Sequence, residues 1–286
     1  MPPRSFVCIV YTSTAKAEVI SQLLRVARAT RGVCNAHHFV DSAYNRTSVY
    51  LVSRHPSLLC STALQVCREA FQLIDYSKHT GTHPALGAVD HICFSPLEPD
   101  ASADEQREIG LEFGSLLNKQ EQVDVHLYGN AAATTTNLKS IRRSLGYFGA
   151  GGSDGAGEEP KPPDFAGSPE MFSSKGVSCV GVVPLVINFN IRLTEASSGD
   201  KKLASQVTAL LRVDGAVEGL TLKWANQLEI ACNLRSSLPE HSCDAVLTKA
   251  KALAAERGLE IESSYTTGPT ARELLETLAA AEEEEE

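Results

Sequence analysis

Three histidines close together form the densest group of chemically versatile side chains in this sequence. His79, His83 and His91 lie within thirteen residues of one another, although the whole chain contains eight histidines. Imidazole titrates near neutral pH, so it suits general acid and base catalysis. Gly81 and Gly87 flank His83, and the proline after it holds the backbone extended, so neighbouring groups can approach the ring closely. The alternative is that His79 and His91 only bond backbone groups around a tight turn.

A metal site is a second hypothesis for these histidines. His79 and His83 stand four residues apart, which is one turn if the segment is helical. Gly81 and Pro84 argue against a helix, and no glutamate separates the two histidines. We therefore predict no metal site. A metal-dependent hydrolase that uses both histidines and Asp90 is kept as an alternative, which metal analysis and chelation would test.

A second polar cluster occupies residues 41–47, between two predicted strands. It contains Asp41, Asn45 and Arg46. A guanidinium with amide and hydroxyl neighbours can clamp a carboxylate, because its fork bonds both oxygens. An ordinary solvated polar turn explains the same residues equally well from the pattern alone.

The first half of the chain alternates strands with helices, and this scaffold must position both clusters. β-branched and aromatic residues predict strands at 6–11, 37–40, 48–52, 91–94 and 125–128. Apolar residues at helical spacing predict helices at 16–31, 57–76, 103–117 and 138–145. The segment 77–87, with glycine and proline breaks, is predicted to be a loop.

The second half is predicted to follow a β-β-α-β-β-α order with a last strand and helix. The predicted strands are 177–183, 185–191, 217–224, 228–232 and 259–264, with helices at 202–211, 243–257 and from 270. This order resembles a ferredoxin-like split βαβ unit. We expect an α+β fold of two ferredoxin-like α/β subdomains whose sheets face each other and enclose a cleft. The subdomains are expected at 1–175 and 176–281, with 149–163 as a linker or surface loop and 282–286 as a disordered acidic tail.

Composition and charge exclude several classes of protein. The chain of 286 residues carries a net charge of −9, and five of its acidic residues are the terminal Glu282 to Glu286, so about −4 remains on the rest. This mildly acidic charge predicts no binding to nucleic acid or to a membrane surface, since both need a broad positively charged surface. The eight cysteines show no CxxC spacing, which indicates core residues in a reducing compartment. With neither a signal peptide nor an apolar run of about 20 residues, we expect a cytoplasmic protein.

Several motifs around the histidines resemble those of a known family. The run from Leu73 to Asp75, followed by the run from His79 to Asp90, resembles the signature of formiminotransferases, also called glutamate formimidoyltransferases. The segments 90–94, 127–129, 140–143 and 145–148 resemble the monofunctional plant and algal homologues, which lack a cyclodeaminase domain. The resemblance runs from the first strand to about residue 266 and therefore covers both expected subdomains.

This resemblance implies a homodimeric transferase of one-carbon metabolism. It implies that a formimino or formyl group moves from a glutamate-derived donor to N5 of tetrahydrofolate, with His83 as general base and without a metal. It implies weaker substrate contacts from Asp41, Asn45, Arg46 and His79. The implied folate-binding residues are Gly167, Ser168, Pro169, Glu170, Met171, Phe172, Ser173, Ser174, Lys175 and Gly176.

The sequence departs from the family pattern on the donor side. Tyr11 to Lys16 replace a Pro-Asn-Phe-Ser-Glu-Gly stretch, and Ala85 replaces an arginine. Two hypotheses follow: an active transferase whose donor differs, or a non-catalytic folate-binding protein on the same scaffold. Because folates are polyanionic, we expect a locally positive cleft despite the acidic body. Its candidate cations are Arg46, Lys78, Lys139, Arg142, Arg143 and Lys175.

Overall fold

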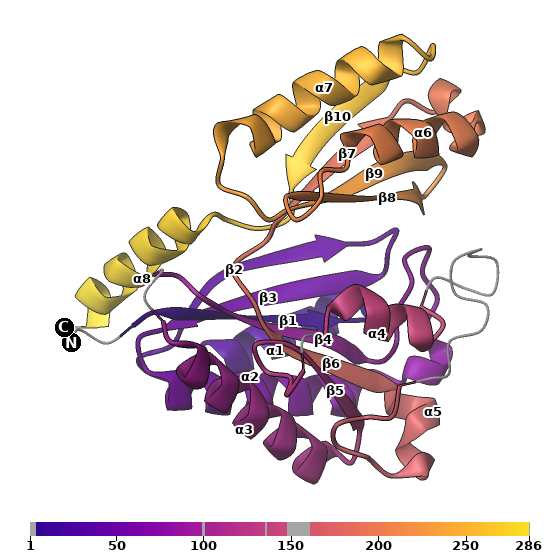
Figure 1. Ribbon diagram of the computed structural model, residues 1–286. Coiled ribbons are helices and arrows are strands. Elements are labelled where there is room, and N and C mark those ends of the chain that lie inside the picture. The colour runs from indigo at the N-terminus through magenta and orange to yellow at the C-terminus, as the bar shows by residue number, and fades with distance from the viewer. Residues whose placement is uncertain (1–3, 99–100, 135, 148–160, 286) are drawn as a thin grey trace. The chain divides into compact units, whose positions relative to one another are not determined.

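The computed structural model describes residues 4–98, 101–134, 136–147 and 161–285. The chain divides into two compact units, coloured along the sequence in Figure 1. Unit 1 consists of Met1–Pro184 with Ala271–Glu286, and unit 2 consists of Leu185–Thr270. Each unit combines one β-sheet with helices, which confirms the predicted α+β class. The predicted glycine-rich linker at 149–157 lies outside the described residues.

Unit 1 contains a six-stranded sheet in the order β2-β3-β1-β4-β6-β5. Neighbours among the first four strands run antiparallel, whereas β6 runs parallel to both β4 and β5. The strands are β1 (Phe6–Thr12), β2 (Cys34–Asp41), β3 (Arg46–Ser53), β4 (Val89–Pro96), β5 (Asp124–Gly129) and β6 (Val177–Val182).

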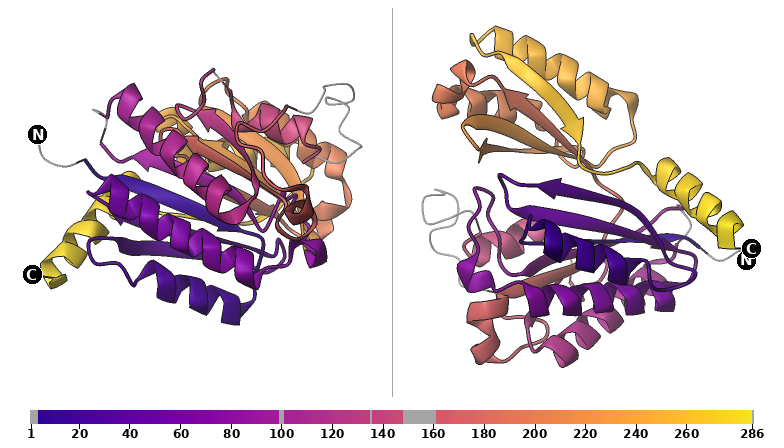
Figure 2. Two further views of the ribbon diagram at one scale, coloured as in Figure 1. Left: turned by 90° about the horizontal axis from the view of Figure 1, so that it is seen from below. Right: turned by 180° about the vertical axis from the view of Figure 1, so that it is seen from behind.

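Helices α1 (Ala17–Ala27), α2 (Pro56–Leu73) and α3 (Ala103–Glu121) cover one face of this sheet (Figures 1 and 2). Alternate residues of β1, such as Cys8 and Val10, point into the core beneath these helices, as the two-residue period of a strand requires. The short helix α4 (Leu138–Ser144) lies on the opposite face of the sheet (Figure 1).

Unit 2 contains a four-stranded antiparallel sheet in the order β10-β7-β9-β8. Its elements follow the chain order β7 (Ile187–Leu193), α6 (Lys201–Leu211), β8 (Val217–Trp224), β9 (Gln227–Leu234), α7 (Cys243–Ala255) and β10 (Ile261–Thr266). This βαββαβ order with that strand order is the ferredoxin-like arrangement. The first four strands of unit 1 repeat it as β4-β1-β3-β2, and β6 and β5 extend that sheet.

Strand β6 lies in a different unit from the one expected. The sequence pattern assigned 177–183 to the second subdomain, from a boundary at residue 175. In the structure β6 pairs with β4 and β5, and its Val180 and Val182 fill the core of unit 1. The units therefore separate after Pro184. A run of small and apolar residues cannot show which sheet a strand joins, since both sheets accept the same pattern.

The acidic C-terminal residues differ from the expected disordered tail. Helix α8 (Ala271–Glu285) includes Glu282 to Glu285, and it contacts β2 and β3 of unit 1. Leu274 and Leu278, one turn apart, are fully or almost fully buried. The Arg54 Nε donates to both carboxylate oxygens of Glu282, at 2.9 and 3.2 Å. The apolar contacts of the helix thus keep it folded although its neighbouring glutamates repel one another.

None of the helices within the described ranges combines the length and the apolar character that crossing a bilayer requires.

The docking of α8 predicts two unequal mutational effects. We expect Leu278→Ala to lower the free energy of unfolding by about 2–5 kcal/mol, because it leaves a cavity in a buried contact. Glu282→Gln should cost less than about 1 kcal/mol, because both partners of its ion pair are partly exposed. Urea unfolding followed by circular dichroism measures both values. A Leu278→Ala variant as stable as the parent would show that α8 is not docked.

Candidate active site

A buried ion pair between Arg46 and Asp90 lies at the centre of the candidate site. Arg46 begins β3 and Asp90 follows the first residue of β4, with β1 between the two strands. Arg46 Nη2 donates to Asp90 Oδ1 at 2.7 Å, and Arg46 Nη1 donates to Asp90 Oδ2 at 3.1 Å. The carboxylate is fully buried. A buried carboxylate is tolerated only when it is paired and hydrogen-bonded, and this bidentate fork meets both conditions.

A β-bulge directs Asp90 toward Arg46. Tyr11 pairs with His91, but the next residue of β1, Thr12, pairs with Val89. Asp90 is therefore the extra residue on β4, and such a residue is re-aimed relative to the regular pleat. Burial alone would lower the pKa of the Arg46 guanidinium, but Asp90 raises it above its usual value, so Arg46 stays charged.

Arg46 also determines the hydrogen bonding of His83. Its Nη1 donates to the Pro84 carbonyl at 2.9 Å as well as to Asp90, which uses both hydrogens of that nitrogen. The Nη1 lies 3.3 Å from His83 Nδ1 but has no hydrogen left to donate there. His83 Nδ1 lies 2.7 Å from the Pro84 carbonyl, which can accept two hydrogen bonds. We therefore assign the proton of His83 to Nδ1, which leaves the lone pair on Nε2.

The surroundings of His83 keep its ring neutral. Burial lowers the pKa of His83 well below its usual value, and the positive charge of Arg46 lowers it further. The ring lies edge-to-face with Tyr44, with centroids 4.9 Å apart, and with Tyr147, at 6.1 Å. His83 is thus an oriented neutral imidazole with an unprotonated nitrogen, as general-base catalysis requires.

Asn45 and His79 hold the loop that carries His83. Asn45 adopts a left-handed backbone conformation with φ +50°, which asparagine tolerates better than most residues. Its side chain accepts from the Ala15 amide at 2.8 Å and donates to the Thr80 carbonyl at 3.0 Å. His79 Nδ1 lies 3.1 Å from the Ser13 carbonyl. Burial lowers the pKa of His79, so this ring is neutral too.

The segment that follows β1 fastens the same loop from the other side. Ser13 Oγ donates to the Gly87 carbonyl at 2.7 Å, and the Ser13 amide donates to the Ala88 carbonyl at 2.9 Å. Thr47 Oγ1 donates to the Thr14 carbonyl at 2.7 Å. The stretch 11–16 therefore has a structural role in holding the site.

The other predicted residues of the two clusters occupy separate places. Asp41 accepts from the Tyr44 amide at 2.8 Å and shapes the turn between β2 and β3. His91 is stacked on Tyr11 with centroids 4.8 Å apart, and its Nε2 lies 2.6 Å from Tyr128 Oη. Its contacts are those of a packed strand residue. The loop after Lys78 is not helical, so the four-residue spacing of His79 and His83 does not place them one helical turn apart.

Tyr147 is a member of the site that residue types and spacing did not indicate. Its Oη lies 3.4 Å from His83 Nδ1. The guanidinium of Arg142 lies 4.4 Å from the centre of the Tyr147 ring, and Arg142 Nη2 lies 4.0 Å from Asp90 Oδ2. More than fifty residues separate Tyr147 from Asp90 in the sequence, so spacing alone carries no signal. The resemblance of residues 145–148 to a family motif was the sequence feature that could have pointed to Tyr147.

The predicted folate-binding segment 167–176 runs beside the start of β5. Backbone amides of Gly167 and Ser168 donate to Asp124 Oδ1 at 2.7 Å and to the Gln122 carbonyl at 2.8 Å. A cavity of about 300 Å³ lies between this segment and residues 122–124. Phe172, in α5 (Phe172–Lys175), is 60% exposed at its rim. More than half of this residue is therefore accessible to a ligand.

The end of this segment joins the loop that carries His83. Gly176 has φ +72° and forms a β-bridge with Gly87, where a side chain on Gly87 would lie 2.6 Å from the Lys175 carbonyl. The Ala88 amide donates to that same carbonyl at 2.8 Å. The cavity itself is lined by none of Arg46, His83 or their partners. Backbone contacts therefore connect segment 167–176 with the loop of His83. The cavity and the Arg46–His83 site are nevertheless separate.

Comparisons with known proteins agree with the motifs. Residues 5–183 match the formiminotransferase domain, N-terminal subdomain. The chain is 30% identical over 289 residues to an Arabidopsis thaliana formiminotransferase cyclodeaminase-like protein, covering 94% of each chain. It is 33% identical over 202 residues to the mouse formimidoyltransferase-cyclodeaminase, covering 69% of this chain and 35% of that one. It is 28% identical over 199 residues to the glutamate formimidoyltransferase of Streptococcus pyogenes serotype M1, covering 69% and 64% respectively.

We expect removal of the Arg46–Asp90 pair to destabilise the fold much more than removal of an exposed ion pair. We expect Arg46→Ala to lower the free energy of unfolding by about 3–5 kcal/mol, because it leaves the Asp90 carboxylate buried without its partner. The matched control is Arg235→Ala, which removes a partly exposed pair with Glu218 and should cost less than about 1 kcal/mol. Urea unfolding compares the two variants. Equal costs would contradict a central role for the buried pair.

Proposed function

We propose that this chain, which belongs to the formiminotransferase family, transfers a formimino or formyl group from a glutamate-derived donor to N5 of tetrahydrofolate. The observation that carries the proposal is the state of His83. Its Nδ1 is engaged by the Pro84 carbonyl at 2.7 Å, and burial with the nearby Arg46 lowers its pKa, so Nε2 is a base at neutral pH. The wider proposal places the enzyme in one-carbon metabolism.

In the proposed mechanism His83 moves one proton twice. When a bond forms between N5 and the formimino carbon, the C=N electron pair moves onto the formimino nitrogen and His83 Nε2 takes the N5 proton. When the bond from that carbon to the glutamate nitrogen breaks, the C=N pair re-forms and Nε2 returns the proton to the departing amine. General acid–base catalysis of this kind contributes about 10²- to 10⁴-fold to a rate.

The Arg46–Asp90 pair supports this role through charge and position. The fixed positive charge near His83 disfavours the protonated imidazole, so the base is available below the pH at which an ordinary histidine protonates. The same guanidinium fixes the Pro84 carbonyl that orients the ring. Arg46 thus supports the proposed base rather than serving as an open substrate ligand.

Folate binding by 167–176 is part of the proposal. The cavity of about 300 Å³ and the exposed ring of Phe172 support it, because a flat heteroaromatic group stacks favourably on such a ring. Lys175 is engaged by Glu121, at 2.8 Å from both its carboxylate and its backbone carbonyl. We therefore assign the recognition of folate in this segment to ring stacking on Phe172 rather than to the charge of Lys175.

The compartment and the assembly are also proposals. We propose a homodimer, as the family resemblance implies, that is cytoplasmic and uses no metal, as the sequence pattern indicates. Cys60, Cys179 and Cys232 are buried, and burial raises the pKa of each thiol to about 12. Such inert core thiols suit a reducing compartment.

Two departures from the family pattern bear on the donor. The stretch 11–16 holds the loop of His83 through Ser13 and contacts β3 through Thr14, so its different sequence keeps a structural role. Ala85 stands where the family usually has arginine, and its carbonyl accepts from Tyr76 Oη at 2.8 Å. The loss of that cation supports the alternative of a non-catalytic folate-binding protein on the same scaffold, which the following experiment separates.

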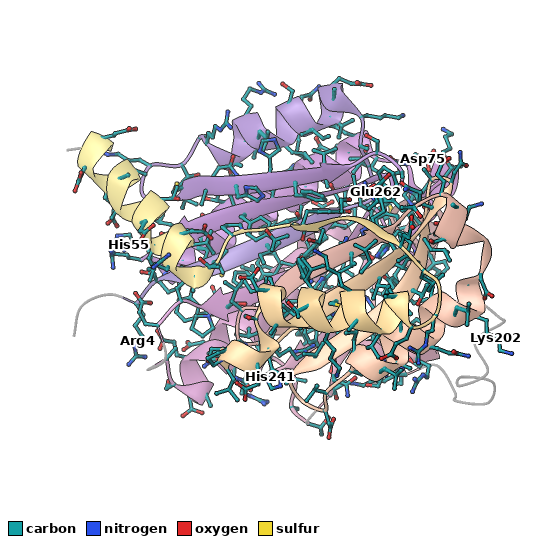
Figure 3. The ribbon with its side chains drawn as sticks, turned by 90° about the horizontal axis from the view of Figure 1, so that it is seen from above. Arg4, His55, Asp75, Lys202, His241 and Glu262 are labelled. Carbon is teal, nitrogen blue, oxygen red and sulfur yellow. The ribbon has the colours of Figure 1, made fainter. Side chains whose placement is uncertain are left out.

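The test uses the full chain with tetrahydrofolate and N-formiminoglutamate, or a formyl donor. We expect His83→Ala to lower kcat/KM by about 10²- to 10⁴-fold, while its Kd for tetrahydrofolate stays near that of the parent. The control is His55→Gln, since His55 is exposed and lies at the far end of unit 1 from Asp75, which precedes the loop (Figure 3). Folate binding with no transfer from either donor would support the non-catalytic alternative.

A further inference from the structure

Arg142 lies beside the candidate base, and within the described part of the chain it has no strong partner of its own. It belongs to α4, which Ile141 anchors against Tyr128 and Cys179 on the side of the sheet opposite α1–α3. The guanidinium is stacked over the Tyr147 ring at 4.4 Å, and the side chain is 17% exposed. The helix and the ring therefore hold Arg142 in place, and part of it remains accessible.

The hydrogen-bonding capacity of Arg142 is largely unused. A guanidinium offers five N–H donors. Arg142 Nη2 lies 4.0 Å from Asp90 Oδ2, beyond hydrogen-bond distance, and its Nε is buried with no hydrogen-bond partner among the residues that the structure describes. Both oxygens of Asp90 already accept from Arg46. A buried N–H donor without an acceptor lowers the stability of the fold. The buried Nε of Arg142 is explained if a bound ligand supplies the acceptor.

The charges around Arg142 favour an anion. Arg46 and Arg142 bring two positive charges to the one carboxylate of Asp90, and the intervening His83 is neutral because burial and Arg46 lower its pKa. One positive charge therefore remains uncompensated among these four side chains. With one face on Tyr147, the planar guanidinium keeps its N–H edge for a bidentate contact, which is the geometry that a carboxylate accepts.

We propose that Arg142 binds a carboxylate of the glutamate-derived donor and so determines its specificity. This inference rests on the proposed function, because it takes His83 as the base at the reacting carbon. In such a donor the departing glutamate nitrogen, one bond from the reacting carbon, is attached to the carbon that carries a carboxylate, so an anion site next to His83 fits the donor. The carboxylates of folate lie beyond its benzoyl group, far from N5.

A binding experiment tests Arg142 without any turnover. Glutarate, a dicarboxylate that lacks the reacting group, is titrated into the full chain by calorimetry. We expect Arg142→Gln to weaken glutarate binding about 10- to 100-fold, the value of a lost hydrogen bond to a charged group. Arg142→Lys should recover part of the affinity. Arg68→Gln is the control, because Arg68 carries the same charge but is exposed on α2, which covers the opposite face of the sheet from α4.

Unchanged glutarate affinity in Arg142→Gln, or equal losses in the Arg142 and Arg68 variants, would overturn the inference. So would a parent protein that binds no glutarate. Variants are compared only if their urea midpoints match that of the parent, so that a folding defect is not read as lost binding.

A kinetic experiment then separates the two sources of carboxylate. For Arg142→Gln we expect a KM for N-formiminoglutamate about 10- to 100-fold higher, with the KM for tetrahydrofolate and the rate with formamidine, a donor without carboxylates, unchanged. A raised KM for tetrahydrofolate alone would contradict the donor assignment. If no donor supports transfer but glutarate binding still depends on Arg142, the proposed function fails while the carboxylate site stands.

Discussion

The candidate site depends on one interaction, the bidentate ion pair of Arg46 with Asp90. The pair connects β3 and β4 across the end of β1, with N–O distances of 2.7 and 3.1 Å. Because Asp90 is fully buried, its carboxylate must be satisfied locally, and Arg46 does so while donating also to the Pro84 carbonyl. That carbonyl in turn orients His83. Strand pairing, charge and the proposed base are therefore held by one guanidinium.

The loop of His83 is fastened by backbone at several points. Ser13 bonds the carbonyl of Gly87, and Gly87 forms a bridge to Gly176 at the end of the segment proposed to bind folate. A loop with this many fixed points keeps a neutral imidazole in one orientation. The excess positive charge that remains, on Arg142, belongs to a side chain with an unused donor. The local field thus differs from that of the acidic chain as a whole, whose net charge is −9.

Much of the scaffold could be predicted from local patterns, whereas contacts between distant segments could not. The helices and strands around residues 17–27, 56–73 and 217–224 follow from apolar periodicity, and the structure confirms them. The sequence marked Arg46 and His83 as separate clusters, but no local signal shows that both meet the carbonyl of Pro84. The bulge at Asp90 is equally hidden, since it depends on register with β1. The placement of β6 in unit 1 was missed because both sheets accept such a strand.

The most direct test of this account is the protonation state of His83 in solution. Nitrogen-15 spectra of the imidazoles, with His83→Gln to assign the signal, report which ring nitrogen carries the proton. We expect a proton on Nδ1, an unprotonated Nε2 at pH 7, and a neutral ring that persists as the pH falls below about 6.5, the ordinary pKa of histidine. A proton on Nε2, or a His83 titration midpoint at or above about 6.5, would contradict the account.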